Sequence, residues 1–72
     1  MKMTSEIVNI VKAGGSVIID SSKMTSEIVN IVKAASPNSE IIIKRASSKM
    51  TSELVNISKA AAGKKVIFDL TD

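Results

Sequence analysis

The sequence contains no cysteine, histidine, tryptophan or tyrosine, and its one aromatic residue is Phe68. Without cysteine no disulfide can form, and without cysteine or histidine the chain lacks the main ligands of zinc, copper and haem iron. The same gaps remove the commonest general bases and nucleophiles. We therefore expect no metal site, no cofactor and no enzymatic activity. The hydrophobic core must be built from aliphatic side chains.

Long hydrophobic runs are also missing. No apolar stretch approaches the roughly 18 residues of a membrane-spanning helix, and the first residues lack the apolar segment of a secretory signal. We expect no membrane association and a cytoplasmic location. The net charge is +3, which is small for a nucleic-acid-binding domain. Two adjacent basic pairs, Lys44-Arg45 and Lys64-Lys65, fall at opposite ends of predicted strands, so nucleic acid is not an expected partner.

What the sequence does contain is one motif in three copies. Residues 2–13 and 23–34 both read KMTSEIVNIVKA, and residues 49–60 read KMTSELVNISKA, with changes only at Leu54 and Ser58. Repetition at this spacing is typical of proteins built from stacked structural units. The identity of the first two copies indicates recent duplication or deliberate construction. The chain stops where a fourth copy would begin, as a segment of a longer array would.

Each copy predicts an amphipathic helix. In the second copy, apolar residues recur at the spacing of one helix face. They are Met24, Ile28, Ile31, Val32 and Ala35. Thr25 or Ser26, or the serines that precede the helix, are expected to cap its start. Gly14-Gly15, Ser36-Pro37-Asn38 and Gly63 are expected to end the three helices.

A short run rich in β-branched residues follows each helix and predicts a strand. The runs are Val17-Ile18-Ile19, Ile41-Ile42-Ile43 and Val66-Ile67-Phe68. Strands that alternate with helices favour a parallel sheet, and continuous apolar runs favour strands covered on both faces. The prediction is an α/β fold with a small three-stranded parallel sheet. It forms a single domain of three helix-strand repeats, residues 2–22, 23–48 and 49–72.

Two strand orders remain open. In the order 1-2-3 the helices cover one face of the sheet, and a partner or second copy must cover the other, apolar face. In the order 2-1-3 the helices cover both faces. A chain of 72 residues buries only about 60% of its unfolded surface, and self-association is the supplement left without disulfides or metals. We therefore expect a small structural or interaction module that forms a homo-oligomer, with a dimer favoured.

An alternative function is weak binding of an anion or nucleic acid. Ligands of parallel α/β sheets usually lie beyond the carboxyl ends of the strands, and the amides of helix starts attract anions. The candidate contacts follow the first two strands. They are Ser21, Ser22, Lys23, Arg45, Ser47, Ser48 and Lys49. These segments lack a glycine that would let the backbone wrap a phosphate, and helix capping by the serines accounts for the same residues.

Two repeat positions carry further expectations. Ser58 replaces the valine found at positions 11 and 32. We expect a terminal helix that is less buried there, with the Ser58 hydroxyl bonded to the carbonyl of Leu54. Glu6, Glu27 and Glu53 each follow a lysine by four residues. They predict solvated charge pairs worth about 0.2–0.5 kcal/mol each.

Overall fold

Helices and strands alternate along the chain, as predicted. In a computed structural model, residues 2–71 are described. The elements are α1 (Thr4–Lys12), β1 (Val17–Asp20), α2 (Thr25–Ala34), β2 (Glu40–Lys44), a 3-10 turn η1 (Ala46–Ser48), α3 (Thr51–Ala61) and β3 (Lys65–Phe68). The predicted α/β fold with three parallel strands is confirmed. No helix in the described range is long and apolar enough to cross a membrane.

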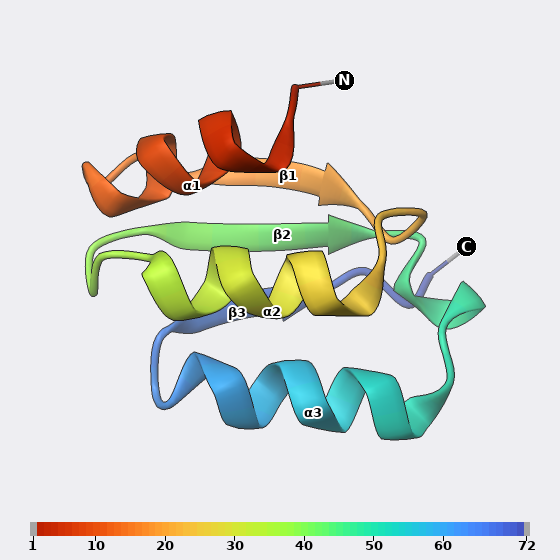
Figure 1. The fold of residues 1–72 in the computed structure, drawn as a ribbon. Helices are drawn as coiled ribbons and strands as arrows, with labels where there is room; N and C mark the ends of the chain where they lie inside the picture. Colours follow the sequence, from red (N-terminus) through yellow and green to blue (C-terminus); the bar gives the residue numbers. More distant parts are fainter. Residues whose placement is uncertain (1, 72) are drawn as a thin grey trace.

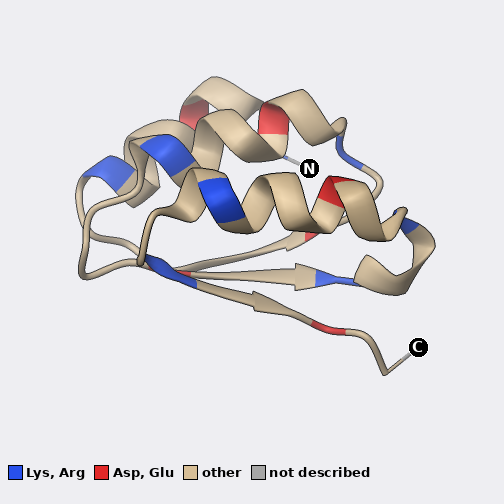
Figure 2. Cartoon of the chain, turned by 90° about the horizontal axis from the view of Figure 1, so that it is seen from below, with Lys and Arg blue, Asp and Glu red and all other residues tan. Residues whose placement is uncertain are grey.

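The three strands lie side by side in chain order, β1-β2-β3 (Figure 1). Their register aligns Ile18 with Ile42 and Ile42 with Ile67. All three helices lie on one side of the sheet (Figure 2), so the expectation that the strands are covered on both faces is wrong. The reason is topological, because crossovers of one hand that all move in one direction along the sheet leave every helix on the same side.

The hydrophobic core lies between the helix layer and the sheet. Alternate strand residues point toward the helices, so Ile19, Ile41 and Ile43 are buried while their neighbours face the other way. The helices contribute Ile7, Val11, Ile28, Ile31, Val32 and Ile57 to this core. Met24 was predicted on the buried helix face, but its side chain is 66% exposed. It precedes the first helical turn with an extended backbone, and therefore lies outside the helical periodicity.

Equivalent isoleucines of the three repeats differ in burial according to their place in the stack. Ile10, Ile31 and Ile57 occupy the same repeat position, and their exposed fractions are 40%, 0% and 0%. The side chain on α1 has no preceding repeat to pack against, whereas those on α2 and α3 do. The α1 end of the stack therefore leaves an apolar side chain in water.

The opposite end of the stack carries a polar residue where the inner repeats have valine. Val11 and Val32 are fully buried, while Ser58 at the same repeat position is exposed. The hydroxyl of Ser58 donates to the carbonyl oxygen of Leu54 at 2.9 Å. The expectation for Ser58 is confirmed, and the two ends of the stack differ in chemistry.

The helix starts differ from the prediction. The cap residues are Met3, Met24 and Met50, none with a side-chain cap hydrogen bond, so the predicted serine and threonine caps are wrong. The Met3 backbone N–H donates to the Glu6 carboxylate at 3.1 Å, and Met50 does the same to Glu53 at 3.1 Å. In these two helices a glutamate of the first turn thus accepts the backbone N–H of the cap residue, as in one half of a capping box.

The predicted helix ends are confirmed, and two side chains for which the sequence predicted no such role bind the carbonyl groups there. Ser39 is 1% exposed, and its hydroxyl donates to the carbonyl oxygen of Val11 at 2.8 Å. Lys64 Nζ donates to the carbonyl oxygens of Lys33 at 2.7 Å and Val32 at 3.4 Å. These carbonyls lie at the carboxyl end of α2, where the helix dipole favours a cation.

Candidate functional site

Three of the predicted anion or partner contacts meet at the carboxyl ends of β1 and β2. The hydroxyl oxygens of Ser21 and Ser48 lie 2.6 Å and 2.9 Å from the carbonyl oxygen of Arg45, and 2.9 Å from each other. The Arg45 backbone is left-handed, with φ 55°, and its guanidinium forms an ion pair with Asp20. The hydrogen bonds of this cluster are therefore made within the chain.

The other predicted contacts have separate surroundings. Ser22 and Ser47 are exposed, and the Ser22 backbone N–H donates to the Asp20 carboxylate at 3.0 Å. Lys23 and Lys49 extend their ammonium groups to the preceding repeat. The ammonium groups of Lys23 and Lys49 therefore bond to neighbouring helix starts and not to the cluster of Ser21, Arg45 and Ser48.

Carboxylates flank this end of the sheet. Asp69 follows β3 and accepts hydrogen bonds from the Thr71 hydroxyl at 2.5 Å and the Thr71 backbone N–H at 3.0 Å. These two bonds hold the pKa of Asp69 below its ordinary value, and the charge of Lys44 lowers it further. Asp69 is therefore ionised at neutral pH. Negative charge beside the cluster opposes an anion, and anion binding at this end stays a prediction without further support.

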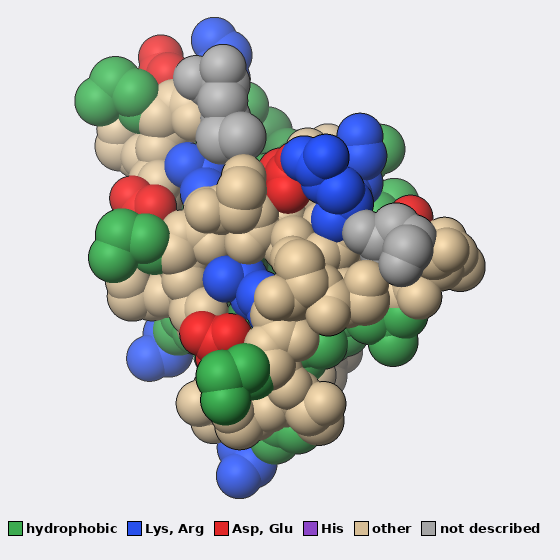
Figure 3. Space-filling model, turned by 90° about the vertical axis from the view of Figure 1, so that its right-hand side faces the viewer, with side chains coloured by type: hydrophobic (Ala, Val, Ile, Leu, Met, Phe, Trp, Pro, Cys, Tyr) green, Lys and Arg blue, Asp and Glu red, His purple; other side chains and the backbone are tan. Residues whose placement is uncertain are grey.

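A ladder of polar contacts joins the helix starts of neighbouring repeats. Lys23 Nζ donates to Thr4 Oγ1 at 3.0 Å, and Lys49 Nζ donates to Thr25 Oγ1 at 3.0 Å. Thr25 Oγ1 donates in turn to Glu53 Oε2 at 3.0 Å. On this side of the molecule, hydrophobic, acidic and basic side chains recur at intervals (Figure 3). The ladder links each repeat to the next in one register.

The predicted Lys–Glu pairs four residues apart form no close ion pair among the described residues, although the charge of Lys49 acts on Glu53. Among residues 2–71 the one ion pair joins Asp20 and Arg45. Each of these lysines precedes an extended cap residue, so it does not lie one helical turn from its glutamate. The sequence shows only that each lysine precedes its glutamate by four residues. It does not show that Lys23 contacts Thr4, because that contact forms only when the helices are stacked.

We expect the substitution Thr25→Val to raise the pKa of Glu53. Hydrogen bonds from the Met50 backbone N–H and then from the Thr25 hydroxyl hold this pKa below its ordinary value, against a smaller opposing effect of burial, and the Lys49 charge lowers it further. Valine removes the second of these bonds, so the pKa should rise without reaching its ordinary value. Carboxyl 13C chemical shifts followed through an acid titration measure it, and Thr4→Val is the matched control that should leave Glu53 unchanged.

The same change affects stability in acid. Because the pKa of Glu53 is lowered by folding, its ionised form stabilises the fold above the pKa of the unfolded chain. That contribution is lost as the pH falls through the folded-state pKa. Thr25→Val should therefore make stability less dependent on pH in the acid range. An unchanged Glu53 pKa in Thr25→Val would contradict the ladder.

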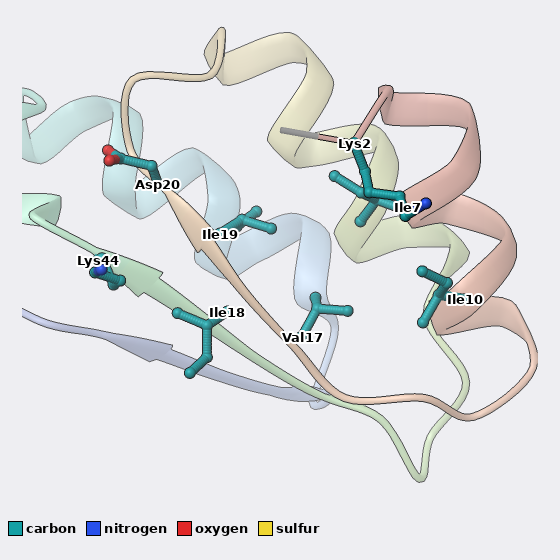
Figure 4. Close-up of a pocket in the computed structure, with 8 residues that line it drawn as sticks. All are labelled: Lys2, Ile7, Ile10, Val17, Ile18, Ile19, Asp20 and Lys44. Carbon is teal, nitrogen blue, oxygen red and sulfur yellow. The ribbon is translucent and has the colours of Figure 1, made fainter.

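A hollow of about 610 Å³ opens at the α1 end of the stack. Ile7 and Ile10 on α1 point toward Val17 and Ile19 on β1 (Figure 4). In the middle of the stack the corresponding space is filled by the preceding repeat. The hollow is therefore the place that another helix-strand unit would occupy.

The second exposed apolar surface is the sheet face that no helix covers (Figure 2). Ile18 is 63% exposed and Ile67 is 42% exposed, while Ile42 between them is partly buried. Their register places the three side chains in one line across the strands, which we call the isoleucine row. Every strand residue on this face other than the isoleucine row is charged, so the apolar surface is a narrow band.

Comparisons with protein-family models, with curated proteins and with solved structures find no match. The function is therefore argued from the surfaces of the chain itself. The sequence pointed to an apolar face only under the strand order 1-2-3, which the structure has. The stack-end hollow and the polar ladder were not predicted.

Proposed function

We propose that the chain is a structural module without catalytic activity that associates with a second copy of itself through the open face of the sheet. The observation that carries this proposal is the isoleucine row, three aligned isoleucines on a face without helices. Apolar surface in water is unfavourable, and its burial against a similar surface is the main driving force of association. A second copy presents such a surface in the same shape.

The hollow at the stack end is a weaker candidate for self-association. Head-to-tail stacking would bring the α3 end of one copy against the α1 end of another. The α1 end carries the exposed Ile10, but the α3 end carries Ser58 where the inner repeats have valine. Ser58 therefore interrupts the apolar surface of α3, although Val55 on the same helix is 43% exposed. The open face is matched with itself, as a symmetric dimer requires.

The size of the open face limits the affinity expected for the dimer. Strands of four or five residues, three of them spaced by about 4.8 Å, span roughly 14 Å by 13–16 Å. A stable complex usually buries about 800 Å² on each partner, and this face offers less. We therefore expect a weak dimer, with a Kd in the micromolar range or above. The cytoplasmic location and the absence of a nucleic-acid partner stay predictions from the sequence.

Solution mass across a wide dilution series tests the proposal. The wild-type mass should rise from monomer toward dimer with concentration. Ile18→Lys places a charge in the isoleucine row and should raise the Kd by at least about tenfold, a change of about 1.4 kcal/mol. Ile10→Lys is the matched control, since it also replaces an exposed isoleucine but lies outside the open face, and it should leave the Kd unchanged.

Three outcomes would reject the open face as the site. The wild type could remain monomeric at all concentrations. The mass could respond to Ile10→Lys as strongly as to Ile18→Lys, which would assign association to the stack-end hollow, because Ile18 also lines that hollow. A salt-dependent affinity for heparin or an oligonucleotide, without self-association, would favour the anion-binding alternative at the carboxyl ends of the strands.

A further inference from the structure

Two rows of polar residues border the isoleucine row on the open face. Side chains alternate along a strand, so residues two positions away from an isoleucine of the row share its face. At the carboxyl ends of the strands, Asp20 lies beside Lys44. Asp69 continues this carboxyl-end row, because its backbone N–H donates to the carbonyl oxygen of Ile43 at 2.9 Å and Lys44 acts on its charge.

At the amino ends of the strands, Glu40 lies beside Lys65. Ser16 completes this amino-end row, since its hydroxyl oxygen accepts the Glu40 backbone N–H at 3.0 Å. From β1 to β3, the carboxyl-end row reads negative, positive, negative. The amino-end row reads neutral, negative, positive. β2 and β3 thus each carry opposite charges at their two ends.

Two symmetric ways exist to lay one such sheet on another with the strands nearly aligned. If the two-fold axis runs along the strands, each row meets the same row of the second copy. Lys44 then faces Lys44, Glu40 faces Glu40, and Asp20 faces Asp69. The contacts of Lys44 with Lys44 and of Glu40 with Glu40 join like charges, which is unfavourable in an interface. Asp20 is already paired with Arg45 within its own chain, so its contact with Asp69 adds less.

If the two-fold axis runs along the isoleucine row, the strands of the two copies are antiparallel and each carboxyl-end row meets an amino-end row. We infer that the dimer has this antiparallel arrangement, in which Lys44 faces Glu40 of the second copy and Asp69 faces Lys65 of the second copy. This inference rests on the proposed self-association through the open face. Asp20 then faces Ser16, and each isoleucine of the row packs on its own counterpart.

The charges act mainly by selecting this arrangement. They are exposed or partly exposed at the border of a small apolar band, where ion pairs add little affinity and are screened by salt. Like charges that face each other still disfavour the wrong orientation. The isoleucine row supplies the attraction, and the two polar rows fix its direction.

Single cysteine variants report the direction, because the native chain has no cysteine. In the antiparallel dimer, Ile18 lies opposite Ile18 of the second copy. Ile18→Cys alone should therefore form a disulfide-linked dimer under mild oxidation, at a rate at least tenfold above that of Ile10→Cys. In the other orientation Ile18 lies opposite Ile67, and rapid cross-linking would require a mixture of Ile18→Cys with Ile67→Cys.

Charge exchange gives an independent readout. Lys44→Glu or Glu40→Lys alone brings like charges together in the antiparallel dimer and should raise the Kd about tenfold or more. The double exchange Glu40→Lys with Lys44→Glu restores opposite charges and should return the Kd to within about threefold of the wild type. Thermal unfolding of each variant at low concentration controls for damage to the monomer.

The outcomes separate this inference from the proposal beneath it. Two results would overturn the antiparallel arrangement alone. One is cross-linking only in the mixture of Ile18→Cys with Ile67→Cys. The other is a Kd that Ile18→Lys raises but that the single charge changes leave unaltered. A wild-type chain that stays monomeric would overturn both. Cross-linking of Ile18→Cys together with recovery in the double exchange would establish the arrangement.

Discussion

The substitution Ile31→Ala is expected to lower the free energy of unfolding by about 2–5 kcal/mol, whereas Ile10→Ala should lower it by less than about 1 kcal/mol. Both isoleucines occupy the same position of identical repeats, so local sequence and helix propensity are matched. Ile31 is fully buried between α2 and its neighbours, while Ile10 is 40% exposed beside the stack-end hollow. The difference therefore measures packing by the preceding repeat.

The loss at Ile31 is large on the scale of the whole fold. A chain of this length is expected to have a free energy of unfolding of roughly 4–11 kcal/mol, so Ile31→Ala should leave a marginal protein. Urea unfolding followed by circular dichroism, at a concentration below the dimer Kd, measures both variants. Equal losses at the two positions would contradict the stacked arrangement of the repeats.

Ser39→Ala is expected to destabilise the fold by about 1–2 kcal/mol, because it deletes a buried hydrogen bond. The hydroxyl of Ser39 connects the start of β2 to the carbonyl of Val11 at the end of α1. That carbonyl also accepts the backbone N–H groups of Ser36 at 2.9 Å and Gly14 at 3.2 Å. The Val11 carbonyl therefore keeps two hydrogen bonds in the variant. The loss of unfolding free energy should be smaller than for a buried carbonyl left without any hydrogen bond.

Ser16→Ala is the control for Ser39→Ala. Ser16 also bonds the start of β2, but it is exposed, so water replaces its hydroxyl and the loss should be below about 0.5 kcal/mol. The same urea unfolding measures both variants. If Ser39→Ala were as mild as its control, the buried bond would not fasten α1 to β2.

The local pattern of the sequence was sufficient for the elements. Apolar spacing in the three copies predicted the helices, the short runs after them predicted the strands, and glycine placed two of the helix ends. The role of Ser58 was predicted because one polar residue interrupts an otherwise repeated apolar face. These features were predictable because helices, strands and helix ends depend mainly on residues that are close together in the sequence.

The order of the strands and the contacts between helices could not be predicted from local sequence patterns. Both strand orders satisfy the same local rules, and a run such as Ile41-Ile42-Ile43 looks identical whether Ile42 faces a second layer or water. The polar ladder was missed for a related reason, since Lys23 meets Thr4 only after α1 and α2 have packed. Of the seven residues predicted for an anion or partner site, three meet, namely Ser21, Arg45 and Ser48. Their hydrogen bonds to one another depend on a left-handed Arg45 that the sequence does not reveal.

The stacking of repeats has a consequence for the way the molecule opens. The main contacts run from α1 to α2 and from α2 to α3, and likewise from β1 to β2 and from β2 to β3. In such a nearest-neighbour array each outer unit is held from one side and the central unit from two. Backbone amides should therefore exchange with solvent first in α1 and α3 and last in α2 and β2. The chain frays inward from both ends, and its central repeat is the last to lose its structure.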